Sequence, residues 1–225
     1  KLDINHSAIF TEDGTWYFGE EKMVRRLVQL YVGLGLYGLS TAMFIRSDLG
    51  VDPWDVFHLG VAIQTGMSIG TVIILTGAAV LLLWIPLRQL PGLGTISNVI
   101  CIGLAADASM ALIPELTSLP VRITLLVSGI VVNALATGMY IGAGFGAGPR
   151  DGLMTGIHAR LGWSIRSVRT AIEVTVLIVG YLLGGAFGVG TVLYALTIGP
   201  LIQLCLPWFR QRPRIQKAAQ PERIV

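Results

Sequence analysis

Two short motifs of the pattern Gly-x-x-Pro-x-Asp, at 50–55 and 146–151, could bind a polar ligand at the start of a helix. In each motif the proline suits the first helical turn, and an acid, Asp55 or Asp151, follows it closely. A helix N-terminus attracts an anionic group, and Arg150 would strengthen that attraction in the second motif. The alternative is structural, because an acid in this place can satisfy the free amides and the dipole of its own helix.

Further polar residues extend this set. Asp52 and His58 add polarity to the first motif, while Asp107, Asn133 and Glu173 lie inside long apolar runs. An ionisable side chain within a membrane segment indicates a functional role by default, here a substrate contact or a proton carrier. The candidate substrate-binding residues are therefore Asp52, Asp55, His58, Asp107, Asn133, Arg150, Asp151 and Glu173.

Three further candidates, besides Asp55 and Asp151, have structural alternatives. Glu173 could pair with Arg169 one helical turn earlier, and Asn133 could form a hydrogen bond between helices. His58 could be a polar residue at the membrane interface. The sequence holds no Ser-His-Asp order and no zinc-ligand spacing, and the glycine-rich run 142–148 lacks the Lys-Ser/Thr ending of a phosphate loop. We therefore expect no enzyme, no metal and no cofactor.

The chain is internally repeated. The prolines of the two motifs are separated by 149 − 53 = 96 positions, and sliding 26–110 onto 122–206 without a gap gives 23 identities in 85 positions. The residue 96 positions later in the chain is called the repeat mate below. Such a repeat directs attention to the seam between its two halves.

The composition is that of an integral membrane protein. The chain is 53% hydrophobic and 13% charged, against about 25% charged residues in a soluble domain. The net charge of +3 does not indicate nucleic-acid binding, because the basic residues lie at the ends and in certain loops. We divide the chain into a polar N-terminal segment (1–22), two membrane repeats (23–113 and 119–208) and a basic cytoplasmic tail (209–225).

Six apolar runs are long enough to cross a bilayer, which takes about 20 helical residues. They are 24–45, 69–88, 94–113, 121–142, 167–186 and 190–208. The stretches 53–65 and 149–161 are too short, and the second is too charged, so we predict short Pro-led helices that are re-entrant or interfacial. The predicted fold is an all-α membrane protein with six transmembrane helices in two three-helix repeats.

The basic residues then predict the topology. With the N-terminus on one side, 14 of the 16 Lys and Arg residues fall on that side and 2 on the other. The positive-inside rule makes the first side cytoplasmic, so both termini are inside. Since each half crosses three times, the halves are predicted to be inverted repeats, with the two Gly-x-x-Pro-x-Asp motifs at opposite mouths.

Three runs carry a resemblance to a known family: 26–34 (RLVQLYVGL), 50–56 (GVDPWDV) and 148–153 (GPRDGL). They resemble the YczE/YyaS/YitT group of bacterial inner-membrane proteins over roughly 24–208. The resemblance implies a polytopic protein of the bacterial plasma membrane. It supplies neither a substrate nor a site residue.

Inverted repeats, interrupted helices and isolated intramembrane acids together favour a small-molecule transporter, a secondary carrier or exporter. The alternative is a non-transporting scaffold or regulatory protein that acts through its cytoplasmic loops and tail. The expected partners are the lipid bilayer and a small-molecule substrate. Glycine spacings such as Gly184 to Gly188 predict packing within the chain, with a homodimer contact as the other use.

Overall fold

The computed structural model describes residues 8–10, 16–18 and 20–210, with side chains from residue 23 onward. Two short strands, β1 (Ala8–Phe10) and β2 (Trp16–Phe18), form an antiparallel pair within the predicted N-terminal segment. In the described part of the chain eight helices follow: α1 (Glu20–Ser47), α2 (Pro53–Thr65), α3 (Ile69–Leu87), α4 (Leu93–Leu112), α5 (Leu119–Ala143), α6 (Pro149–Leu161), α7 (Ile165–Leu182) and α8 (Val189–Phe209). The basic tail after residue 210 lies outside the described residues.

Five of these helices are long and apolar enough to cross a membrane: α1 from Met23, α3, α4, α5 and α8. Their outer faces suit lipid, because Leu82, Leu104 and Leu196 each expose more than half of the side chain. The fifth predicted span, 167–186, differs, since α7 ends at Leu182 and carries Arg166, Arg169 and Glu173 within 18 residues. The structure is thus a helical membrane protein. In its second half one long helix, α7, is more polar than the five apolar helices.

The short helices α2 and α6 occur where the motifs predict them. Each has its proline in the first turn, and each ends at a glycine of left-handed conformation, Gly66 (φ 71°) or Gly162 (φ 70°). Glycine adopts this conformation without the steric cost that a Cβ atom brings, so it ends the helix cleanly. The two helices are 13 residues long each, too short to span a bilayer.

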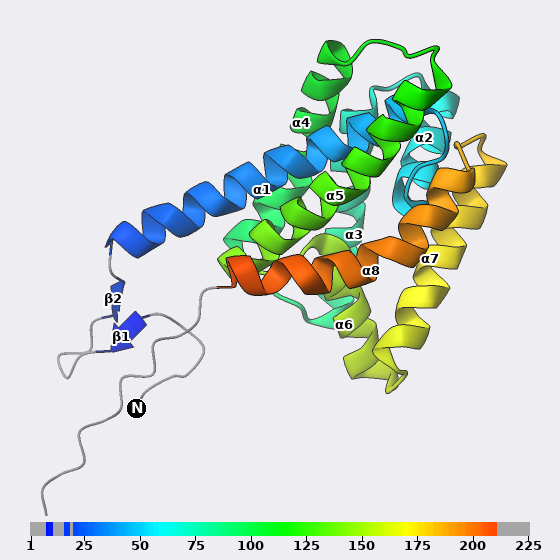
Figure 1. The fold of residues 1–225 in the computed structure, drawn as a ribbon. Helices are drawn as coiled ribbons and strands as arrows, with labels where there is room; N and C mark the ends of the chain where they lie inside the picture. Colours follow the sequence, from blue (N-terminus) through cyan, green and yellow to red (C-terminus); the bar gives the residue numbers. More distant parts are fainter. Residues whose placement is uncertain (1–7, 11–15, 19, 211–225) are drawn as a thin grey trace, which may run out of the picture.

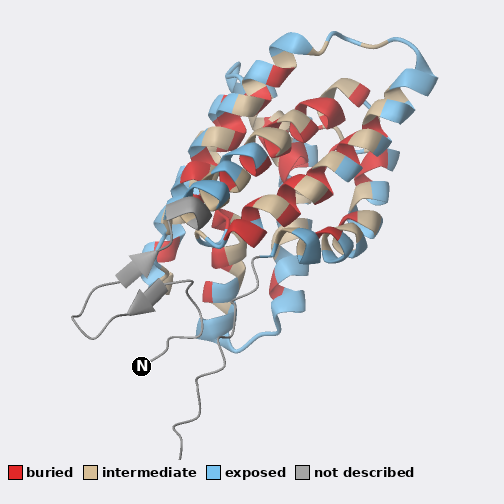
Figure 2. Ribbon diagram, turned by 60° about the vertical axis from the view of Figure 1, so that its left-hand side comes forward, coloured by how far each residue is buried: buried red, intermediate tan, exposed pale blue. Residues whose placement is uncertain are grey.

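Helices α1 and α5 form the centre of the molecule and run antiparallel (Figure 1). At one end Arg26 Nε donates to the carbonyl oxygen of Ala143 at 2.9 Å, and at the other Arg122 Nε donates to that of Ser47 at 2.7 Å. Buried residues concentrate where these helices meet their neighbours, while exposed residues lie at the periphery (Figure 2).

Contacts between the halves come in pairs related by 96 positions. Gly33 lies against Tyr140, and their mates, Gly129 and Phe44, also lie against each other. Likewise the amide N–H of Gly94 donates to Phe145 at 2.8 Å, and that of Gly190 donates to Leu49 at 2.7 Å. The two halves therefore pack on each other through equivalent surfaces.

The short helices pack on the opposite half of the chain, α2 on α7 and α6 on α3. A Cβ atom at Gly180 would overlap the backbone of Phe57, and one at Gly152 would overlap the ring of Trp84, so both contacts need glycine. The halves differ in one respect: α3 packs along α4, whereas the mates α7 and α8 hardly touch.

Candidate functional site

Asp52 caps the N-terminus of α2. Its Oδ1 atom accepts hydrogen bonds from the backbone N–H groups of Trp54 (2.8 Å) and Asp55 (3.0 Å), and Pro53 occupies the first helical turn. The residue is 1% exposed, and its Oδ2 atom is buried without a hydrogen-bond partner among the described residues. The Oδ1 atom therefore stabilises the N-terminus of α2, and the Oδ2 atom is available to accept a hydrogen bond from another donor.

Asp55 and His58 form a buried pair in the first two turns of α2. The i, i+3 spacing places them on one helix face, and His58 Nδ1 lies 3.0 Å from Asp55 Oδ1. Asp55 is 3% exposed and His58 7%. Within the described chain, Asp55 Oδ2 is a second buried carboxylate oxygen with no partner.

Arg150, from the N-terminal turn of α6, reaches these acids from the other half. Its guanidinium donates to the hydroxyl of Tyr37 on α1, and Nη1 lies 3.9 Å from Asp52 Oδ1. The guanidinium carbon also lies 5.5 Å from the ring centroid of Trp54. The two motifs begin at opposite ends of the α1–α5 pair, since Gly50 lies against Gly188 and Gly146 against Gly92. The side chains at the N-termini of α2 and α6 nevertheless meet, which the sequence did not predict.

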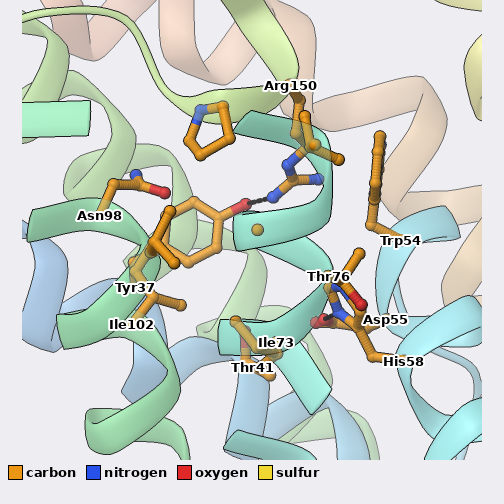
Figure 3. A pocket seen from close by; sticks show the side chains of 14 residues that line it. Tyr37, Thr41, Trp54, Asp55, His58, Ile73, Thr76, Asn98, Ile102 and Arg150 are labelled. Atoms are coloured by element: carbon orange, nitrogen blue, oxygen red, sulfur yellow. Dashed lines mark hydrogen bonds and ion pairs between the residues drawn. The ribbon is translucent and has the colours of Figure 1, made fainter. Parts of the chain in front are cut away.

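A cavity of about 50 Å³ lies between these groups, with space for a few water molecules. Figure 3 shows Arg150 at one end, Asp55 and His58 beside Thr76 further along, and Tyr37 and Asn98 on the facing wall. The lining residues are Tyr37, Thr41, Trp54, Asp55, His58, Ile73, Thr76, Gly77, Val80, Asn98, Val99, Ile102, Pro149 and Arg150. Those of α1, α3 and α4 lie at least four residues from the helix ends, so the cavity is deep within the helix bundle.

Sequence reasoning missed Tyr37, Thr41 and Trp54. Tyr37 and Thr41 are four residues apart on α1 and so lie on one helix face. Two polar side chains on one face of an otherwise apolar span were the available signal. Trp54 lies inside the first motif, but an aromatic residue there gave no sign that its ring would lie near a cation.

Four of the predicted residues come together at this cavity: Asp52, Asp55, His58 and Arg150. Asn133 lies nearby on α5, fully buried, where it donates to Ser40 Oγ (2.9 Å) and accepts from the hydroxyl of Tyr194 (3.1 Å). It thus links α1, α5 and α8.

The other three candidates do not line the cavity. Asp107 accepts from Ser68 Oγ at 2.6 Å and from the backbone N–H of Gly70 at 2.7 Å, so its carboxylate binds the start of α3. Glu173 accepts from Arg169 Nε at 2.9 Å on α7, the structural alternative that the sequence offered. Asp151 Oδ2 accepts from the hydroxyl of Tyr140 at 3.1 Å. Residues 20–210 contain no group of three His, Cys, Asp or Glu side chains arranged to hold a metal ion.

Residues 24–207 match the model of a family of unknown function, DUF6198. The chain belongs to this family. An uncharacterised protein of Haemophilus influenzae is 39% identical over 186 residues, which cover 83% of this chain and 85% of that protein. The uncharacterised membrane protein YczE of Bacillus subtilis is 31% identical over 190 residues, 84% of this chain and 88% of that protein.

The uncharacterised protein YyaS, also of Bacillus subtilis, is 26% identical over 184 residues, 79% of this chain and 92% of that protein. No solved structure matches the chain. The resemblance to the YczE and YyaS group is therefore confirmed. A membrane location is supported both by a relative described as a membrane protein and by five apolar helices of spanning length.

Proposed function

We propose that this member of the family is a secondary carrier or exporter of a small molecule in the bacterial plasma membrane. The observation that carries the proposal is the contact between the N-termini of α2 and α6, where Arg150 Nη1 lies 3.9 Å from Asp52 Oδ1 beside a buried polar cavity. Charged groups inside a membrane protein are costly, and they mark substrate and ion pathways. Interrupted helices whose ends meet at depth are the usual way in which carriers build a substrate site.

The proposed membrane arrangement has six crossings: the five apolar helices of spanning length and α7. Its charged residues Arg166, Arg169 and Glu173 all lie in its first nine positions, nearest the predicted cytoplasmic side, so the rest of the helix is apolar. Each half then crosses three times, and the halves enter from opposite faces. The antiparallel course of the mates α1 and α5 supports this arrangement, and the excess of basic residues on one side supports cytoplasmic termini.

The Asp52–Arg150 contact gives the carrier a physical means of changing state. One partner belongs to each half, and both interact with the same aromatic residue, Trp54, through its backbone N–H or its ring. Rocking one half against the other would separate the two charges and open the cavity toward one face.

The test is the accessibility of the cavity from each face. Cys101 and Cys205 are first replaced by serine, and a single cysteine is introduced at Thr76, a half-buried residue of the cavity wall. A membrane-impermeant thiol reagent is then applied to right-side-out or inside-out vesicles. A carrier exposes the cysteine of Thr76→Cys to both faces in turn, so both preparations label.

Two control variants show which membrane face each vesicle preparation exposes to the reagent. Leu90→Cys lies in the loop between α3 and α4, and Glu115→Cys in the loop between α4 and α5; both native side chains are 91% exposed. Since a single helix separates them, each should label from one face only, and from opposite faces. Labelling of Thr76→Cys from one fixed face, or from neither, would contradict the carrier and favour the scaffold.

A further inference from the structure

The groups around the cavity include two acids, one permanent cation and one histidine. Two buried carboxylates, Asp52 and Asp55, lie close to a single guanidinium, that of Arg150. That guanidinium already donates to Tyr37 and lies near Asp52 Oδ1, so neither contact reaches Asp55. With His58 neutral, one carboxylate has no opposite charge beside it, and a positively charged ligand would supply that charge.

Two atoms of the lining residues are buried acceptors without a partner in the described chain: Asp55 Oδ2 and Thr41 Oγ1. A buried polar atom without a hydrogen bond costs free energy, and nearly all such atoms in native proteins have a partner. His58 does not resolve this, because it contacts Oδ1 of Asp55 whichever tautomer it adopts. The missing partner is a donor that reaches Oδ2.

Apart from Thr76 and Asn98, the remaining walls are apolar or aromatic. Ile73, Val80, Val99 and Ile102 contribute from α3 and α4. In the view of Figure 3, Thr41, Ile73 and Asp55 lie on the lower side of the cavity, whereas Arg150 lies on its upper side and donates to Tyr37. One end of the cavity thus offers oxygen atoms and negative charge, with hydrocarbon next to it.

We propose that the substrate of the carrier is a compact organic ammonium ion, whose amino group donates to Asp55 Oδ2 and Thr41 Oγ1 and whose hydrocarbon part packs against Ile73 and Ile102. This inference rests on the proposed transport function and names its substrate class. An ammonium group brings several donors and no acceptor, which matches two unpartnered oxygens. A cavity of about 50 Å³ limits the ligand in this state to a few non-hydrogen atoms.

The experiment measures thermal unfolding of the purified full chain with two matched series of small ions. Ethylammonium and n-propylammonium form one series, and acetate and propionate form the other, all at equal ionic strength. A ligand that binds the folded state raises the unfolding temperature in a saturable manner. We expect saturable stabilisation by the two ammonium ions and none by the carboxylates.

Two variants locate the binding. Asp55→Asn removes a charged acceptor and should weaken ammonium binding by at least about tenfold, while Thr41→Val removes one neutral hydrogen bond and should weaken it about two- to tenfold. The matched control is Asp48→Asn, an acid of the same α1–α2 loop that pairs with Arg122 and is 79% exposed. It should bind the ammonium ions as the natural chain does. If Asp55→Asn does not fold, Thr41→Val still decides the assignment.

The outcomes separate this inference from the function on which it rests. Stabilisation by the carboxylates alone would overturn the substrate class but would keep the cavity as the binding site. Stabilisation by neither series would also overturn the ammonium proposal, and labelling of Thr76→Cys from both faces would then preserve the carrier. Equal loss of binding in Asp48→Asn and Asp55→Asn would show that the ions bind elsewhere.

Discussion

The N-termini of α2 and α6 are repeat mates that share a backbone and differ in chemistry. Both helices start with a proline and end at a left-handed glycine. The cap of α2 is Asp52, whose carboxylate accepts two backbone hydrogen bonds, but its mate Gly148 has no side chain with which to cap α6. The duplication thus preserved the frame of the two helices while their first turns diverged.

The second difference lies two positions further on, where Trp54 is the repeat mate of Arg150. A cation in the first turn of a helix is unfavourable, because the helix dipole places positive charge there. Arg150 is stabilised instead by the opposite half, through Asp52 and the hydroxyl of Tyr37. The comparison teaches that each half supplies one charge of a pair, so neither N-terminus is complete without the other.

Asp52→Ala tests this dependence most strongly. The substitution removes the cap of α2 and leaves Arg150 without its carboxylate. We expect a loss of about 3 kcal/mol in the free energy of unfolding, the lower end of the range for breaking a buried ion pair. The lower end applies because the side chain of Arg150 retains 34% of its exposure. Denaturant unfolding of the purified protein in detergent measures it.

Two further variants serve as controls for Asp52→Ala. Gly148→Ala changes the mate position, where no capping bond exists, and should cost less than about 1 kcal/mol. Asp52→Asn keeps a capping oxygen but removes the charge, so its loss should lie between the other two. Similar losses for Asp52→Ala and Gly148→Ala would mean that the two N-termini do not differ as described.

The sequence predicted this region unevenly. The 96-residue repeat and the prolines located α2 and α6, and the glycines at 66 and 162 end these helices. The repeat could not predict that the two N-termini meet. The repeat shows which residues share a backbone conformation. The distance between the N-termini of α2 and α6 depends instead on how α2 packs on α7 and α6 on α3. That crossed packing depends on contacts such as Gly152 on Trp84, which have no local signature.

The polar residues were likewise predicted in part. Asp55 and Arg150 were identified through the repeated Gly-x-x-Pro-x-Asp motif, and Asp52 as a further polar residue within it. Tyr37 and Thr41 were not, because tyrosine and threonine are common in apolar helices, and only tertiary packing turns this face of α1 toward the cavity.

His58→Met sharpens the comparison, since methionine is the natural residue at the mate position, 154. The change removes the partner of Asp55 Oδ1 and leaves a buried carboxylate with neither oxygen paired. We expect a loss of about 2 kcal/mol in the free energy of unfolding, the desolvation cost of an unsatisfied buried group. The same denaturant experiment measures it.

His158→Met is the matched control, because His158 is an exposed histidine of the mate helix α6. Water can replace the hydrogen bond of its Nδ1 atom to Trp163, so its loss should stay within about 0.5 kcal/mol. If His58→Met were as mild as His158→Met, the His58–Asp55 pair would contribute little to the fold.

The smallest effect is expected at another repeat pair, Gly77 and Glu173. Gly77 packs against Val99 on α4, whereas Glu173 lies on α7, which hardly touches α8, and pairs with Arg169. The two side chains of that pair are 38% and 51% exposed, so solvent screens their attraction. Glu173→Gln should therefore change the free energy of unfolding by less than about 0.5 kcal/mol. A clearly larger loss would place Glu173 in a buried network, and a change in proteoliposome flux without loss of stability would return it to the substrate pathway.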